Sequence, residues 1–93
     1  MPKFSVGTPT EIEMNDLSRD LRDEADGDGW KAYELYPDES DVANQRLQIV
    51  WNASAKRAGI VFVGSGSSGH TSWTDATSPE DAVRRYLEDD MCN

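Results

Sequence analysis

The sequence has a single cysteine, Cys92, and only nine basic residues against eighteen acidic ones. One cysteine excludes an intrachain disulfide, so we expect a protein of the reducing cytoplasm. The net charge of −9 argues against direct binding to nucleic acid or to an anionic membrane. No apolar run has the length of a signal-peptide core or of a membrane span. These features indicate a small cytoplasmic protein.

A phosphate-binding loop is indicated only weakly. Gly64, Gly66 and Gly69 match the G-x-G-x-x-G pattern directly after a predicted strand. A phosphate cradle requires a helix N-terminus immediately behind the glycines, because the helix supplies the backbone N–H groups. The next predicted helix begins near Ser78, which is too far along the chain. We therefore interpret the glycines as a hairpin loop.

A calcium loop is also indicated weakly. Glu24, Asp26, Asp28 and Gly29 have the spacing of an EF-hand loop. The position of the bidentate glutamate falls on Leu35, and a predicted strand replaces the helix that should leave the loop. A helix end followed by a turn is the better interpretation.

Catalytic groups are similarly scarce. His70 lies among loop serines and near Asp75, but no nucleophile elbow accompanies them. We therefore expect no enzymatic activity, no cofactor and no metal site. The rival hypothesis is a small hydrolase or nucleotide-binding protein built on His70 and the loop over residues 64–69.

The strongest structural signal is a β-hairpin over residues 45–64. Leu47, Ile49 and Trp51 alternate with more polar positions, and a second apolar run over 59–64 follows a short polar break. An isolated hairpin is only marginally stable, so other segments must cover its apolar face. The predicted core comprises Leu17, Leu21, Leu47, Ile49, Trp51, Ile60, Phe62, Val83 and Leu87.

A first helix is predicted over residues 10–25. Its apolar residues, Met14, Leu17, Leu21 and Ala25, are spaced along one helical face. Glycines in the stretch over 26–29 end this helix.

Three further elements complete the prediction. An aromatic strand covers residues 30–36, a short fourth strand covers 70–74, and Ser78-Pro79 begins a second helix as N-cap and first helical residue. The order is α-β-β-β(β)-α. We expect one α+β domain over residues 1–93, with flexible ends at 1–9 and 90–93. It would be a two-layer sandwich of a three- or four-stranded antiparallel sheet with both helices on one face.

The charges are distributed unevenly along the chain. Residues 11–41 contain twelve acids and three bases, residues 75–90 contain six acids and two bases, and residues 42–74 contain three bases and no acid. One interpretation is a solvated surface kept soluble by repulsion. The other is an acidic face that imitates the phosphate backbone and docks on a basic protein surface. The predicted partner-binding residues are Asp16, Asp20, Asp23, Glu24, Asp26 and Asp28, with a second patch at Asp38, Glu39 and Asp41.

Short strings in this chain resemble phage-encoded anti-CRISPR proteins. They are residues 13–17 (EMNDL) with Leu21 on the first helix, the aromatic strand, and residues 45–50 (QRLQIV). The resemblance, which covers about residues 13–65, implies an αβββα arrangement and inhibition of a nuclease by acidic mimicry of DNA. The family has an acidic Asn-Asp-Gly turn between two strands, whereas this chain has Asn52-Ala53-Ser54-Ala55-Lys56-Arg57. No binding residue is therefore transferred from that turn.

The leading functional hypothesis is a cytoplasmic, phage-encoded inhibitor. It would be a monomer or a weak homodimer that binds a basic surface of a nucleic-acid-processing complex. An alternative is an immunity protein or antitoxin that neutralises a nuclease toxin. A third is an accessory module whose charge serves solubility alone. Acidity indicates the sign of the partner's surface and leaves open whether the acidic faces or the loop over 64–69 makes the contact.

Overall fold

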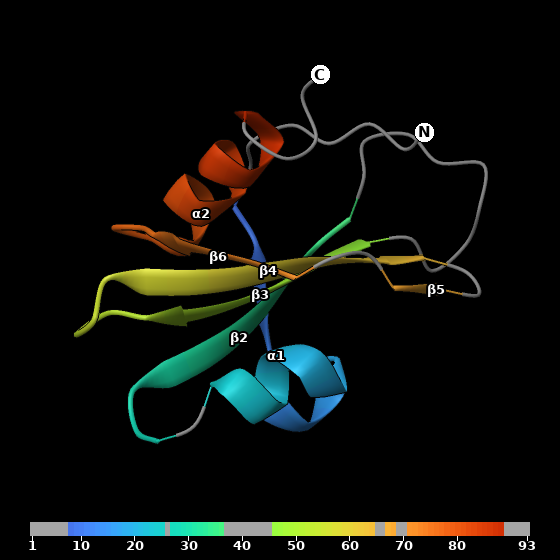
Figure 1. Ribbon diagram of the computed structural model, residues 1–93, viewed down its shortest axis with the longest axis horizontal. Coiled ribbons are helices and arrows are strands. Elements are labelled where there is room, and N and C mark those ends of the chain that lie inside the picture. Colours follow the sequence, from blue (N-terminus) through green and yellow to red (C-terminus); the bar gives the residue numbers. More distant parts are fainter. Residues whose placement is uncertain (1–7, 26, 37–45, 65–66, 69–70, 89–93) are drawn as a thin grey trace.

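The computed structural model describes residues 8–25, 27–36, 46–64, 67–68 and 71–88 (Figure 1). Apart from residues 8 and 9, the ends predicted to be flexible lie outside these ranges. The elements in chain order are β1 (Thr10–Ile12), the 3-10 helix η1 (Met14–Asp16), α1 (Arg19–Glu24), β2 (Trp30–Leu35), β3 (Arg46–Asn52), β4 (Arg57–Gly64), β5 (Ser67–Ser68), β6 (Ser72–Asp75) and α2 (Pro79–Tyr86).

The described strands form one six-stranded antiparallel sheet, larger than the predicted sheet of three or four strands. β1, β2, β3 and β4 follow one another across it, and both β5 and β6 pair with the far side of β4. The predicted hairpin is β3–β4, in which Leu47 lies opposite Phe62 and Ile49 opposite Ile60. The predicted fourth strand is β6, shifted slightly along the chain. The α+β fold is therefore confirmed.

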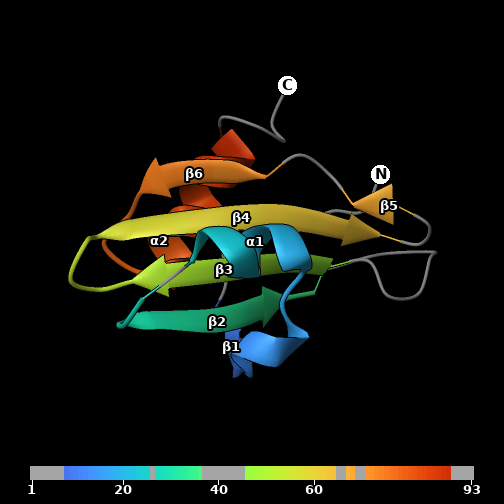
Figure 2. The same cartoon turned by 60° about the horizontal axis from the view of Figure 1, so that its bottom comes forward.

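The two helices cover opposite faces of the sheet (Figures 1 and 2), so the prediction that both pack on one face in two layers is wrong. On one side, α2 buries Val83 against Ile49 and Ile60. On the other, α1 buries Leu21 against Val50 and Val61. The apolar residues of β3 and β4 occupy both sides of each strand, which is typical of a strand buried on two faces. Each face therefore needs its own helix.

The prediction of a first helix over residues 10–25 is also wrong in its first half. Thr10–Ile12 pairs as β1 with residues 32–34 of β2, and the α-helix begins only at Arg19. Pairing with the edge of β2 satisfies backbone groups that a helix would otherwise satisfy. The second half of the prediction holds, because Leu21 and Ala25 are buried and positive φ angles at Gly27 and Gly29 reverse the chain into β2.

The second helix begins as predicted. Ser78 is the N-cap, its hydroxyl oxygen accepts a 3.0 Å hydrogen bond from the backbone N–H of Asp81, and Pro79 follows as the first helical residue. The Trp51 indole N–H donates to the carbonyl oxygen of Ala76, which joins the approach to α2 to the sheet. Of the nine predicted core residues, six are buried, and three are partly buried against the α2-side cluster: Trp51, Phe62 and Leu87.

Candidate functional site

Five of the nine predicted partner-binding carboxylates lie on one described stretch that begins in η1 and ends before β2. All five are exposed, and we call them the acidic face: Asp16, Asp20, Asp23, Glu24 and Asp28. Among the residues that the structure describes, none of these carboxylates forms an ion pair. The other four predicted residues lie outside the described residues: Asp26, Asp38, Glu39 and Asp41.

The acidic face is held to the sheet by one buried amide. The Gln48 side chain on β3 accepts a 2.7 Å hydrogen bond from the backbone N–H of Ser18 and donates a 2.9 Å bond to the carbonyl oxygen of Asp16. Gln48 is 1% exposed, so it exchanges no bond with bulk water. Because Ser18 is the N-cap of α1, these bonds determine where η1 ends and α1 begins.

Gln48 itself is oriented by a charged pair. Its amide nitrogen donates to the Glu34 carboxylate at 3.1 Å, and the same oxygen accepts a 2.6 Å bond from Arg46. Burial raises the pKa of Glu34, but the hydrogen bonds from Gln48 and Arg46 and the charge of Arg46 outweigh it, so the net pKa is lowered. Glu34 therefore stays ionised and keeps the amide in place.

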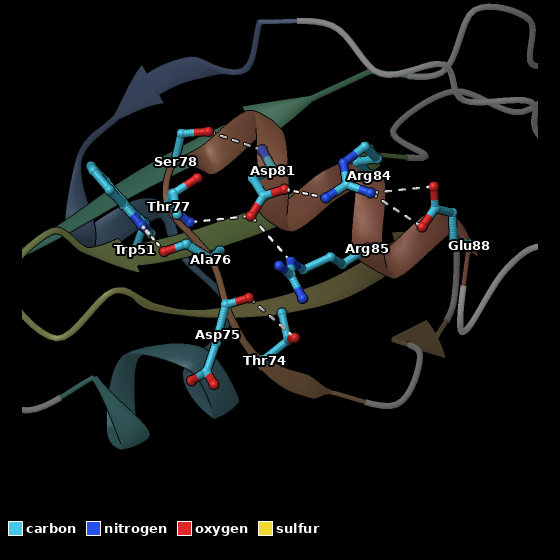
Figure 3. Close-up of polar contacts among 10 residues, drawn as sticks. All are labelled: Trp51, Thr74, Asp75, Ala76, Thr77, Ser78, Asp81, Arg84, Arg85 and Glu88. Atoms are coloured by element: carbon cyan, nitrogen blue, oxygen red, sulfur yellow. Dashed lines mark hydrogen bonds and ion pairs between the residues drawn. The ribbon is translucent and has the colours of Figure 1, made fainter.

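Asp81 of α2 differs from the carboxylates of α1 because two basic neighbours pair with it (Figure 3). Asp81 is 2.6 Å from Arg84 and 3.1 Å from Arg85, and Arg84 also approaches Glu88. The hydrogen bond from Arg84, followed by that from the Thr77 backbone N–H, lowers the pKa of Asp81 to about 2. On α1, Arg19 and Arg22 are exposed and form no ion pair with a described carboxylate. The carboxylates of the acidic face are therefore available to a partner.

One side of α1 borders a cleft of about 420 Å³ beside β6. Its lining residues are Asp20, Asp23, Glu24, Thr71 and Trp73. The Trp73 ring packs against Gly59, where an added Cβ would come within 2.8 Å of the ring. The guanidinium carbon of Arg57 lies 5.8 Å from the Trp73 ring centroid, a distance typical of a cation–π contact.

A second cleft of about 530 Å³ lies where β1 ends and η1 begins, at the edge of β2. We call it the edge cleft; its lining residues are Glu11, Ile12, Glu13, Met14, Asp16, Trp30, Lys31 and Ala32. The Trp30 ring meets the Trp73 ring edge-to-face, with centroids 6.0 Å apart. One ring of this aromatic pair therefore lines each cleft.

Sequence reasoning missed most of the residues that line these clefts. Trp73 is covered only by the predicted fourth strand over residues 70–74, and Glu11 and Glu13 by the predicted first helix. Only the tertiary structure brings β6 beside α1. The available sequence signal was the alternation of acidic and apolar residues over Glu11, Ile12, Glu13 and Met14, which is typical of a strand and not of a helix.

The patterns for other chemistry find no support in the described residues. No group of three or more His, Cys, Asp or Glu side chains among them is arranged to hold a metal ion. After Gly64 the chain continues into β5 and β6, and α2 begins only at Pro79. His70 lies outside the described residues. None of the described helices is both long and apolar enough to span a bilayer.

Comparison with known proteins finds no match for this chain among protein-family models, curated proteins or solved structures.

Proposed function

We propose that this protein is a cytoplasmic inhibitor that binds another protein through its acidic face. The partner surface would be a basic, nucleic-acid-binding surface of a nucleic-acid-processing complex. The mode of action would be the acidic mimicry expected from the resemblance to phage-encoded anti-CRISPR proteins.

The observation that carries this proposal is the difference between the two helices. Asp81 of α2 pairs with Arg84 and Arg85, whereas the carboxylates of the acidic face have no ion-pair partner in the described part of the chain. Unpaired like charges on a compact domain destabilise it through repulsion. A basic partner relieves this repulsion, and long-range attraction accelerates the encounter.

The test is capture of a partner from host lysate by the immobilised full chain. The double variant Asp20→Lys/Asp23→Lys should abolish capture, and wild-type capture should fall as salt rises from about 50 to about 500 mM, since screening shortens the range of the attraction. The control is Glu80→Lys/Glu88→Lys, in the first turn of α2 and just after its C-cap, which changes the net charge equally and should capture normally.

Undiminished capture by Asp20→Lys/Asp23→Lys would refute the proposal. Circular dichroism of each variant confirms that the fold is kept. The identity of the captured protein distinguishes the proposed inhibitor from the alternative function. Capture of a nuclease toxin would indicate an immunity protein or antitoxin.

A further inference from the structure

The edge cleft, which includes Asp16 of the acidic face, has an apolar floor. Ile12, Met14 and Trp30 line it and are only partly buried. The floor forms where β1 stops after pairing with residues 32–34, so that Trp30 has no partner on β1. Tryptophan and methionine are residue types enriched in the centres of protein interfaces.

The rim of the edge cleft is acidic. Glu11, Glu13 and Asp16 are exposed and form no ion pair with any described residue, while Lys31 is the one basic residue among the lining side chains. By contrast, the cleft beside β6 is lined mainly by carboxylates. The edge cleft thus combines apolar contact area with an excess of negative charge.

We infer that the edge cleft binds a basic segment of the partner in which one large apolar side chain is flanked by arginine or lysine. This inference rests on the proposed function and specifies how the partner is selected. The apolar side chain would contact Met14 and Trp30, and the flanking cations would lie against Glu13 and Asp16. A cleft of about 530 Å³ has room for a leucine-sized side chain.

The two kinds of contact have different roles. The carboxylates attract any basic surface, so charge alone discriminates poorly between nucleic-acid-binding proteins. Desolvated apolar contacts at the centre of an interface contribute much of the affinity and slow dissociation. The apolar floor therefore makes the acidic face selective for one basic surface.

The inference is tested with two synthetic peptides and the full-length wild-type protein. The peptides are Lys-Arg-Leu-Arg-Lys and Lys-Arg-Ser-Arg-Lys, which carry the same charge. Binding is followed by NMR through the Met14 methyl and Trp30 indole signals, assigned with Met14→Leu and Trp30→Phe. The leucine peptide should bind about tenfold more tightly than the serine peptide, because it buries an apolar side chain.

Two variants locate the binding site. Met14→Ser should abolish the preference for the leucine peptide, so that the two peptides bind with about equal affinity, because the floor becomes polar. Tyr36→Ser is the matched control, since Tyr36 is an exposed aromatic residue outside the cleft; it should leave the preference unchanged.

The outcomes separate this inference from the proposed function. Equal affinity for the two peptides, or signal changes confined to residues outside the edge cleft, would overturn the inference. So would an absence of leucine-peptide binding at millimolar concentration. None of these results alters the capture experiment with Asp20→Lys/Asp23→Lys, which tests the proposed function by itself.

Discussion

At the scale of single residues, the most consequential side chain is a polar one in the sheet. Gln48 is buried within the strand that also contributes Leu47 and Ile49 to the core. A buried amide is tolerated only when its hydrogen-bonding groups are satisfied. Here the partners are backbone groups at the start of α1 and the Glu34 carboxylate. The residue therefore couples the sheet to the acidic face.

Replacing Gln48 with Met preserves the size of the side chain and removes its hydrogen bonds. The Ser18 N–H and the Asp16 carbonyl oxygen would lose their partner, so we expect the free energy of unfolding to fall by about 2–4 kcal/mol. Urea denaturation measures this loss. Amide hydrogen exchange at Ser18 should accelerate in the variant. Unchanged stability together with unchanged exchange would show that the amide does not hold α1.

At the scale of elements, the two helices are stabilised in different ways. The six-residue α1 is too short to be stable alone and depends on Leu21 and Ala25 beneath it. The longer α2 has a satisfied N-cap at Ser78, acids in its first turn and basic residues in its last turn. As a result, the charges of α2 support its own structure, whereas those of α1 remain exposed.

Asp81 makes the stability of the α2 end depend on pH. Its pKa of about 2 in the folded protein lies below its ordinary value of 3.8. The carboxylate therefore stabilises the fold above about pH 4, and this contribution is lost as the pH falls toward 2. Arg84 and Arg85 are 46% and 43% exposed, so we expect a contribution of at most about 1 kcal/mol after screening by solvent.

The measurement compares thermal unfolding of wild type and Asp81→Asn at several pH values. Wild type should be the more stable at pH 6, and the difference should narrow as the pH falls from about 4 toward 2, where about half of the Asp81 carboxylates are protonated in the folded protein. If the stability difference between wild type and Asp81→Asn stayed constant over the whole pH range, the lowered pKa of Asp81 would be contradicted.

At the scale of the whole molecule, an excess of negative charge surrounds a core with two faces. The net charge is −9. In the ion pairs among the described residues, the basic partners are Arg46, Arg84 and Arg85. Repulsion among the remaining carboxylates opposes the compact state. The charge that would favour binding to a basic partner therefore reduces the stability of the isolated protein.

Salt should accordingly stabilise the isolated protein. We expect the melting temperature to rise between about 10 and about 150 mM sodium chloride, because the Debye length shortens to about 8 Å. The rise should be smaller for Asp20→Lys/Asp23→Lys, in which part of the repulsion is removed. A melting temperature that falls with salt would indicate that the ion pairs outweigh the repulsion.

Much of the fold was predictable because local signals agreed with the tertiary structure. Alternation in β3 and β2, the Ser78-Pro79 helix start and the glycines after α1 each depend on neighbouring residues alone. The continuous apolar run in β4 also contained the evidence for burial on two faces. The predicted core includes only one side of that run, Ile60 and Phe62, and such a one-sided core agrees with the incorrect placement of both helices on the same face.

By itself, the sequence determined the strands of the central hairpin, the second helix and the acidic character of the segment that contains α1. These follow from periodicity, caps and composition, which are local properties. Only the tertiary structure decided that residues 10–12 form β1, that Gln48 holds α1, and that Trp30 meets Trp73 between two clefts. Each of these depends on groups far apart in the chain, because the free energy of an edge pairing or a buried amide depends on the partner that the fold supplies.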